Sequence, residues 1–315
     1  MKVRTAGLLD LSRIEEMHRS SEIKLSETAP PAARLWSVLS STLSALLPLY
    51  QETLMYVAED HGKVVGFIQA SGQPQALDLR RARVMQVLNL HVADDSDPDE
   101  VAPALVEHLS NQALERGALR LFVRVPDRDA LLPAFRLRGF RQYATEQVLY
   151  ADRPKQRSDE YPIGARSSKR GDDRKLYQLY RKVTPQGVSQ VEAPTYRDWK
   201  ALHTEGAAGS QVVDRIEVVG WVRAQRGGQA RPDTLQLMAL PESPLPSELA
   251  DFGISLLGDS NAPAWSSLRH YDSHMIDALR GRGFSILLTQ LLLVKELAVR
   301  VPKPVREKGL VPSFG

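Results

Sequence analysis

The chain has 315 residues, enough for about two domains of ordinary size. Hydrophobic residues make up 43% and charged residues 25%, proportions typical of folded globular proteins. The absence of cysteine excludes disulfides, thiolate metal sites and a cysteine nucleophile. With 41 Lys and Arg against 38 Asp and Glu, the net charge is only +3, and the densest basic run is Arg80–Arg83. This balance argues against a nucleic-acid partner.

No membrane-spanning helix is expected. The longest apolar stretch, Ile286–Leu297, is interrupted by Lys295 and Glu296, whereas a span needs about 20 apolar residues. The N-terminal residues Met1–Thr5 have no apolar signal core behind their charges. The sequence therefore predicts a cytoplasmic protein with no membrane association.

Two segments occur twice in the same order. Val64–Ala70 is echoed by Val218–Ala224, and Leu137–Phe140 is echoed by Gly281–Phe284. The repeats indicate tandem copies of one domain. We expect an N-terminal domain over 1–150, a polar linker over 151–161, a C-terminal domain over 162–300 and a tail over 301–315.

Hydrophobic periodicity predicts alternating strands and helices in both copies. In the first copy, Gly62 is expected to provide a positive φ in a hairpin turn. Strands are expected at 3–5, 54–58, 64–70, 84–92, 119–125 and 141–150, with helices from Leu11, at 32–47, from 101 to 116 and at 130–138. In the second copy, strands are expected at 163–166, 212–224, 234–240, 264–269 and 284–294, with helices at 175–182, 248–257 and 273–280. This order predicts an α/β fold with a mixed sheet in each half.

Three short matches, in this element order, carry a family resemblance: Val3–Ala6 followed by Asp10, then Val65–Gly66, then Arg138–Phe140. Together they resemble the GNAT superfamily of acyl-CoA-dependent N-acyltransferases. The resemblance covers nearly the whole chain as two copies. It implies two tandem GNAT-like domains, acetyl-CoA as the cofactor and an amine as the small-molecule substrate.

In that family, a glycine-rich loop leads into a helix and holds the coenzyme A pyrophosphate through backbone N–H groups. The loop falls on 92–102 in the first copy, where Asp97, Pro98 and Glu100 replace the basic residue and two glycines. Five carboxylates within seven residues would repel a diphosphate, although acids and proline also make a good helix start. The resemblance leaves Leu90, Val92 and Ala102 as candidate cofactor contacts.

The second copy has a different loop. Pro241–Glu242 matches the family pattern, but Pro244 stands at the basic position. Ser247 is expected to cap the helix through its hydroxyl and leave N–H groups for a phosphate. Leu240 and Ser247 are the candidate cofactor contacts of this copy.

Catalytic groups are sparse. The family's acidic tyrosine corresponds to Phe135 and Leu279, which cannot donate a proton. Tyr143 is a candidate substitute, and the alternative is an edge-strand tyrosine with no special role. His91 is a candidate base, since it shares a strand face with Asn89 and has a suitable intrinsic pKa. The alternative is a strand-end histidine that points to solvent or is hydrogen-bonded locally.

One further cluster has metal-ligand spacing. His270 and His274 are four residues apart and flank Asp272, but no third ligand is evident. Asp272 or Ser273 fits the N-cap of the following helix equally well. No metal site is therefore expected.

Two functions remain open. The first is a tandem N-acyltransferase that uses acetyl-CoA or another acyl-CoA. The second is a non-catalytic binding or structural protein that has lost acetyl-CoA binding. Binding of acetyl-CoA separates them.

Overall fold

The structure is a computed structural model of the chain. It describes residues 1–17, 52–72, 84–202, 209–227, 232–258 and 262–297. Three predicted features lie outside the described residues: the helix over 32–47, the basic run Arg80–Arg83 and the tail over 301–315.

The first half forms the predicted elements in the predicted order, and residues 11–17 are helical. His61 and Gly62 have φ values of 49° and 80°, so a two-residue turn with two positive φ angles joins the first hairpin, as expected at Gly62. The elements are β1 (Lys2–Thr5), η1 (Leu8–Asp10), β2 (Glu52–Asp60), β3 (Lys63–Gly72), β4 (Val84–Val92), α3 (Pro98–Glu115), β5 (Arg120–Pro126), α4 (Leu132–Leu137) and β6 (Arg141–Ala151).

The second half follows the same plan with two differences. The strand predicted over 212–224 is wrong as one element, because a turn at 215–217 divides it into two antiparallel strands. Two short helices, α6 and α7, were not predicted. The elements are β7 (Ala165–Ser167), η2 (Arg170–Asp172), α5 (Asp173–Val183), α6 (Gln186–Glu192), α7 (Tyr196–Leu202), β8 (Gln211–Asp214), β9 (Val218–Gln225), β10 (Asp233–Ala239), α8 (Leu245–Leu257), β11 (Ala264–Arg269), α9 (Ser273–Arg280) and β12 (Ser285–Glu296).

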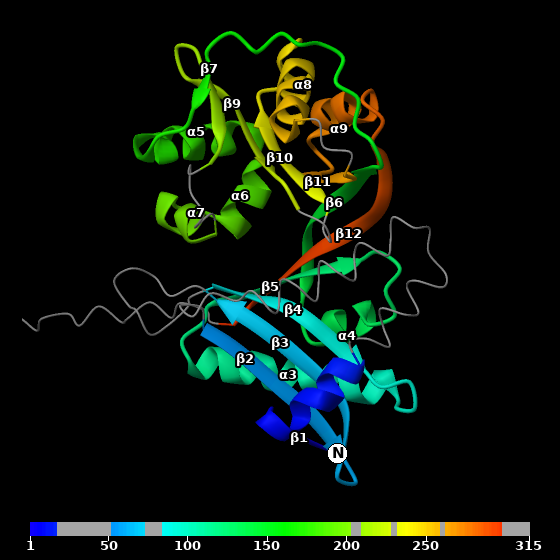
Figure 1. The fold of residues 1–315 in the computed structure, drawn as a ribbon. Helices are drawn as coiled ribbons and strands as arrows, with labels where there is room; N and C mark the ends of the chain where they lie inside the picture. Colours follow the sequence, from blue (N-terminus) through cyan, green and yellow to red (C-terminus); the bar gives the residue numbers. More distant parts are fainter. Residues whose placement is uncertain (18–51, 73–83, 203–208, 228–231, 259–261, 298–315) are drawn as a thin grey trace, which may run out of the picture.

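The strands of the described residues form one continuous mixed sheet (Figure 1). Its order is β1-β2-β3-β4-β5-β12-β6-β11-β10-β9-β8-β7. The last strand of each half therefore pairs with the other half: β12 lies antiparallel to β5, and β6 lies antiparallel to β11. β12 and β6 also pair with each other. We call the four strands β5, β12, β6 and β11 the seam.

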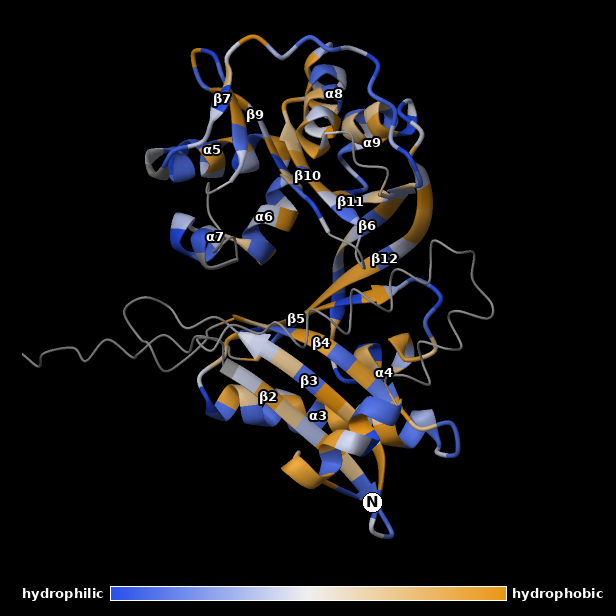
Figure 2. Cartoon of the chain, in the orientation of Figure 1, coloured by the Kyte–Doolittle hydropathy of each residue, from blue (hydrophilic) through white to orange (hydrophobic). Residues whose placement is uncertain are grey.

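The exchanged strands complete the hydrophobic cores. The core of the first half includes Leu293 of β12, and the core of the second half includes Leu149 of β6; both side chains are fully buried. Apolar residues lie along the strands and on the helix sides that pack on them (Figure 2). Because each core contains a strand from the other half, burial of apolar area ties the two halves together. Among the described residues, no helix is both long and apolar enough to cross a bilayer.

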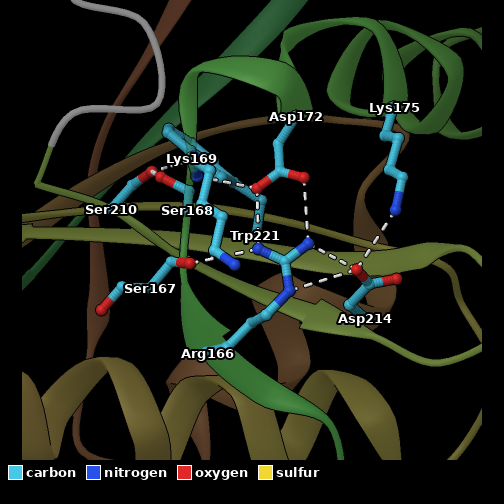
Figure 3. Close-up of polar contacts among 9 residues, drawn as sticks. All are labelled: Arg166, Ser167, Ser168, Lys169, Asp172, Lys175, Ser210, Asp214 and Trp221. Atoms are coloured by element: carbon cyan, nitrogen blue, oxygen red, sulfur yellow. Dashed lines mark hydrogen bonds and ion pairs between the residues drawn. The ribbon is translucent and has the colours of Figure 1, made fainter.

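An arginine–aspartate contact occurs in both halves with the same geometry. Arg4 of β1 donates two hydrogen bonds to Asp10, at 2.7 and 2.9 Å. Arg166 of β7 donates two to Asp172 at the same distances, and Asp214 of β8 accepts from the same guanidinium (Figure 3). These hydrogen bonds lower the pKa of Asp10 and of Asp172 to about 2. The contact fixes the start of each half and is a third element of the repeat.

The Arg-Gly-Phe echo also has a structural basis. Gly139 and Gly283 have φ values of 83° and 92°, which favour glycine. Arg138 donates to the carbonyl of Pro103 in α3 (3.1 Å), and Arg282 donates to the carbonyl of Ser247 in α8 (2.8 Å). In each half the arginine therefore ties the last turn before the final strand to the long helix.

Candidate functional site

The sheet opens between two parallel strands in each half. β4 pairs with β5 only over Val84–Val87, although both strands continue beyond that point. A register shift against β3 occurs at Leu88, just where this pairing stops. β10 pairs with β11 only over Asp233–Thr234. Each half therefore has one place where the strands separate and their backbone groups can face a ligand.

The candidate base lies on one wall of the first opening. Asn89 and His91 share a face of β4, as predicted: Asn89 donates to Gln69 (2.7 Å), and the His91 ring stacks on Phe67 with centroids 4.9 Å apart. Phe67 belongs to a small core with Ile14. His91 therefore has an aromatic neighbour in the core, and a role as base stays a prediction.

The backbone N–H groups at the start of α3 donate to acceptors within the chain. Asp97 is the N-cap: its side chain accepts the N–H of Asp99 (2.9 Å), and its carbonyl accepts from Glu100 (3.3 Å) and Val101 (3.0 Å). Pro98, the first residue of α3, has no N–H. Every backbone N–H of this first turn therefore has an acceptor within the chain.

The acids before and within this turn remain on the surface. Asp94, Asp95, Asp97, Asp99 and Glu100 are exposed. Lys63 makes an ion pair with Asp95 (2.5 Å) and lowers the pKa of that carboxyl through its hydrogen bond. The candidate contacts Leu90 and Val92 pack against the first core, and Ala102 is fully buried within α3.

The start of α8 differs from the prediction. The N-cap is Pro244, and no side chain caps the helix, so the expectation that Ser247 caps it is wrong. The carbonyl of Pro244 accepts the N–H of Ser247 (3.0 Å) and of Glu248 (3.1 Å), and Leu245 N–H donates to Glu242 (3.0 Å). Pro246 has no N–H. The candidate contact Leu240 donates its N–H to Val219 (2.9 Å), as Ala93 does to Val65 in the first half.

A buried polar network crosses the seam. Glu146 of β6 is directly opposite Gln290 on β12 and Arg269 on β11. It accepts hydrogen bonds from Gln290 and from Arg124 of β5 (3.2 Å), and lies 3.4 Å from Arg269. Burial alone would raise the pKa of Glu146, but Arg124 and Arg269 keep it below its usual range. Glu146 is therefore a buried carboxylate between two guanidinium groups.

Helix α6 adds a second carboxylate to this network. Glu192, at the end of α6, accepts from Arg269 (2.6 Å), Tyr143 (2.9 Å) and Tyr180 (3.2 Å). Arg120 of β5 donates to the carbonyl of Val191 in the same helix. The network thus joins both halves through six elements: β5, β6, β11, β12, α5 and α6.

Tyr143 belongs to this network rather than to a sheet edge. Its expected alternative as an edge-strand tyrosine is wrong, because β6 lies between β12 and β11. Its ring packs edge-to-face on Phe122 of β5, with centroids 5.6 Å apart. Burial, and then the charge of Glu192, raise the pKa of Tyr143 far above its usual range. Tyr143 therefore retains its proton and donates it in a hydrogen bond to Glu192.

The predicted histidine–aspartate cluster is divided between elements. His270 lies in the turn after β11 and donates its backbone N–H to Thr145 (2.9 Å), whereas His274 is exposed in the first turn of α9. Asp272 occupies the N-cap position of α9, as predicted, without a side-chain capping bond. Burial raises the pKa of Asp272 to about 7.

Comparisons with known proteins agree with this geometry. The model of the acetyltransferase (GNAT) family matches residues 14–140. A GCN5-related N-acetyltransferase from Sphaerobacter thermophilus has a similar structure, with a TM-score of 0.61 and 16% identity, covering 95% of this chain and 96% of that chain. A tandem GNAT protein from the clavulanic acid biosynthesis pathway has a TM-score of 0.57 and 14% identity, covering 95% of this chain and 99% of that chain. No curated protein matches the chain.

Residues 14–140 therefore match the GNAT family, and the mixed α/β fold of the chain is consistent with two tandem GNAT-like domains. The seam network was not predicted from the sequence. Its only local signal is a polar residue within an apolar strand, at Glu146 and at Gln290. Neither position identifies its partners, since Gln290 is 144 residues and Arg124 is 22 residues from Glu146 in the chain.

Proposed function

We propose that this GNAT-superfamily protein is a non-catalytic binding protein whose two helix starts do not hold acetyl-CoA. One observation carries the proposal: the first-turn N–H groups of α3 and of α8 already donate to the chain itself. A diphosphate would have to displace Asp97 at α3. At α8 it would have to compete with the carbonyls of Glu242 and Pro244.

Electrostatics support the proposal at α3. An anion at a helix N-terminus gains about 0.3–2 kcal/mol from the helix dipole. Each exposed carboxylate about 4 Å from a diphosphate oxygen costs about 1–4 kcal/mol, depending on the local dielectric. Of the five exposed acids, Asp95 forms an ion pair with Lys63. Repulsion by these carboxylates therefore opposes the attraction of the helix start.

The two positions that correspond to the family's tyrosine also support the proposal, because neither holds a proton donor. Phe135 and Leu279, at the family's tyrosine positions, are buried apolar residues. Tyr143 is engaged with Glu192, and its raised pKa makes it a poor acid for a leaving thiolate. Helix α6 also contacts the first half, because Arg120 of β5 donates to the carbonyl of Val191. The Arg120 guanidinium lies over the ring of Phe122, so this contact is on the sheet face that carries Phe122.

Isothermal titration calorimetry with the full chain tests this proposal. Coenzyme A and acetyl-CoA, each titrated to about 1 mM, are expected to give no saturable heat. A dissociation constant in the micromolar range for either ligand would overturn the proposal. An acetyltransferase of the same superfamily, titrated under the same conditions, provides the positive control.

An N-acyltransferase is the second candidate, and one observation favours it. Asp272 follows β11, the strand that separates from β10, in the turn before α9, and its raised pKa of about 7 suits a general base near neutral pH. The acceptor would be an amine, and acetyl-CoA the acyl donor. Release of free thiol from acetyl-CoA with a panel of primary amines, lost in Asp272→Asn, would support this candidate over the first.

The cytoplasmic location expected from the sequence belongs to the same proposal. Fractionation of cells that express the full chain tests it. Recovery in the membrane or secreted fraction would contradict it.

A further inference from the structure

The second half presents a basic surface on α5 and α7. Between residues 166 and 200, seven basic side chains are exposed: Lys169, Arg174, Lys175, Arg181, Lys182, Arg197 and Lys200. The four acids of this segment, Asp172, Asp173, Glu192 and Asp198, are buried or half-buried. Figure 2 shows hydrophilic residues along much of α5 and α7. The exposed charge of this segment is therefore entirely positive.

The helical repeat gathers this charge on one side of α5. At 100° per residue, Arg174, Gln178 and Arg181 lie within about 60° of one another, and Lys175 and Lys182 are adjacent. The opposite side carries Leu176 and Leu179, which pack in the core of the second half. The basic residues were not conspicuous in the sequence, because Leu176 and Leu179 lie between them.

Helix α7 extends the surface. The guanidinium of Arg174 lies 5.8 Å from the ring centroid of Tyr196, the first residue of α7, and Lys200 pairs with Asp173 (3.3 Å). Tyr196 and Tyr177 are half-buried and contact each other edge-to-face. Aromatic rings therefore lie beside the basic groups.

Several of these cations have no carboxylate partner. Lys175 pairs with Asp214, and Lys182 pairs with Glu217. Within the described part of the chain, Lys169, Arg174, Arg181 and Arg197 form no ion pair that could neutralise them. Arginine dominates this set, and its planar donor groups suit phosphate oxygens.

We propose that this surface of α5 and α7, defined by Arg174, Arg181 and Arg197, binds single-stranded nucleic acid through its phosphate backbone. A nucleic-acid strand with its row of phosphates matches a surface on which the exposed charges of α5 and α7 are all positive, and aromatic groups beside the cations allow a base to stack. Along α5, successive helical turns about 5.4 Å apart carry the pair Arg174 and Lys175, then Gln178, then the pair Arg181 and Lys182. The surface does not involve either helix start, so the inference is independent of acyl-CoA binding.

Fluorescence anisotropy of a labelled 20-nucleotide single strand, RNA or DNA, tests the inference on the full chain. With about four phosphate contacts, log K is expected to fall with log salt concentration with a slope of about −3. The triple variant Arg174→Gln, Arg181→Gln, Arg197→Gln is expected to bind at least tenfold more weakly at 50 mM salt, with a slope near −1.

A matched variant separates this surface from net charge. Arg128→Gln, Arg136→Gln, Arg153→Gln removes the same charge at exposed sites elsewhere, and binding is expected to change less than twofold. Equal losses in both triple variants would overturn the inference, as would no binding at 50 mM salt. Displacement of the oligonucleotide by polyglutamate of equal charge at equal concentration would assign the surface to an acidic protein instead. Circular dichroism of each variant verifies folding.

Discussion

Glu146 and Gln290 are direct cross-strand partners at the middle of the seam, and the Gln290 amide donates to the Glu146 carboxylate. The two residues also correspond within the repeat, since they are separated by the same interval as Gly139 and Gly283. A pseudo-twofold axis therefore passes between them. Equivalent residues at such an axis face each other. Two carboxylates in these positions would repel each other, whereas an amide can donate a hydrogen bond to a carboxylate.

Gln290→Glu tests this relationship. The substitution places a second carboxylate against a buried one, and one of the two must take up a proton or leave the network. We expect a loss of about 3 kcal/mol in the free energy of unfolding at pH 7, measured by urea denaturation. The loss should shrink at pH 5, because sharing of a proton becomes easier. Gln142→Glu on the exposed part of β6 is the control, and an equal effect there would contradict the prediction.

The arginines of the Arg-Gly-Phe echo, Arg138 and Arg282, provide a second prediction in which one half is the control for the other. Arg282 and Asp251 are about 95% buried and lie 2.5 Å apart, whereas Arg138 and Glu107 are partly exposed at 3.0 Å. Arg282→Met leaves a buried carboxylate unpaired and should cost about 3 kcal/mol. Arg138→Met should cost about 1 kcal/mol or less. Urea denaturation measures the free energy of unfolding of both variants. Similar losses in the two would contradict the prediction that the buried ion pair contributes more than the partly exposed one.

Most of the strands and helices could be predicted because their signals are local. The periodicity of Val101, Leu105 and Leu109 specifies α3, and Gly62 specifies a turn. The exchange of β6 and β12 could not be predicted, because both strands carry a similar apolar pattern and either one could pair with β5. Pairing partners of equal hydrophobicity are decided by tertiary packing.

The site was less predictable than the fold. The expectation that the loop before α3 holds a diphosphate poorly came from the identities of Asp97, Pro98 and Glu100. The seam network depends on contacts between Glu146, Arg269 and Glu192, which no local spacing encodes. Tyr143 was predicted as a candidate proton donor. In the structure its side chain is buried beside the charged groups of Glu192 and Arg269, which belong to the second half.

Asp272 predicts an unusual pH dependence. Burial raises its pKa to about 7 in the folded chain, above about 3.9 in the unfolded chain. The unfolded state therefore loses this proton first, and this contribution to stability is complete below pH 4 and is lost as pH rises through 7. Asp272→Asn should leave stability unchanged at pH 4 and raise it by about 4 kcal/mol at pH 8. Thermal denaturation from pH 4 to 8 measures this, with Asp277→Asn on α9 as the control. A gain at pH 8 no larger than that of the control would contradict the assigned environment.

The start of α3 can be rebuilt to test why it would reject the coenzyme. Asp97→Arg with Glu100→Gly frees the N–H of Asp99, removes two carboxylates and restores one glycine position. Loss of the cap should cost about 1 kcal/mol of stability. Coenzyme A affinity, measured by calorimetry, should rise at least tenfold, because a diphosphate gains both a donor and a cation. Asp127→Arg with Asp159→Gly makes the same charge change at exposed sites away from the helix start, and should leave affinity unchanged. If the rebuilt loop gains no more than this control, neither the capped N–H nor the local charge is what prevents binding.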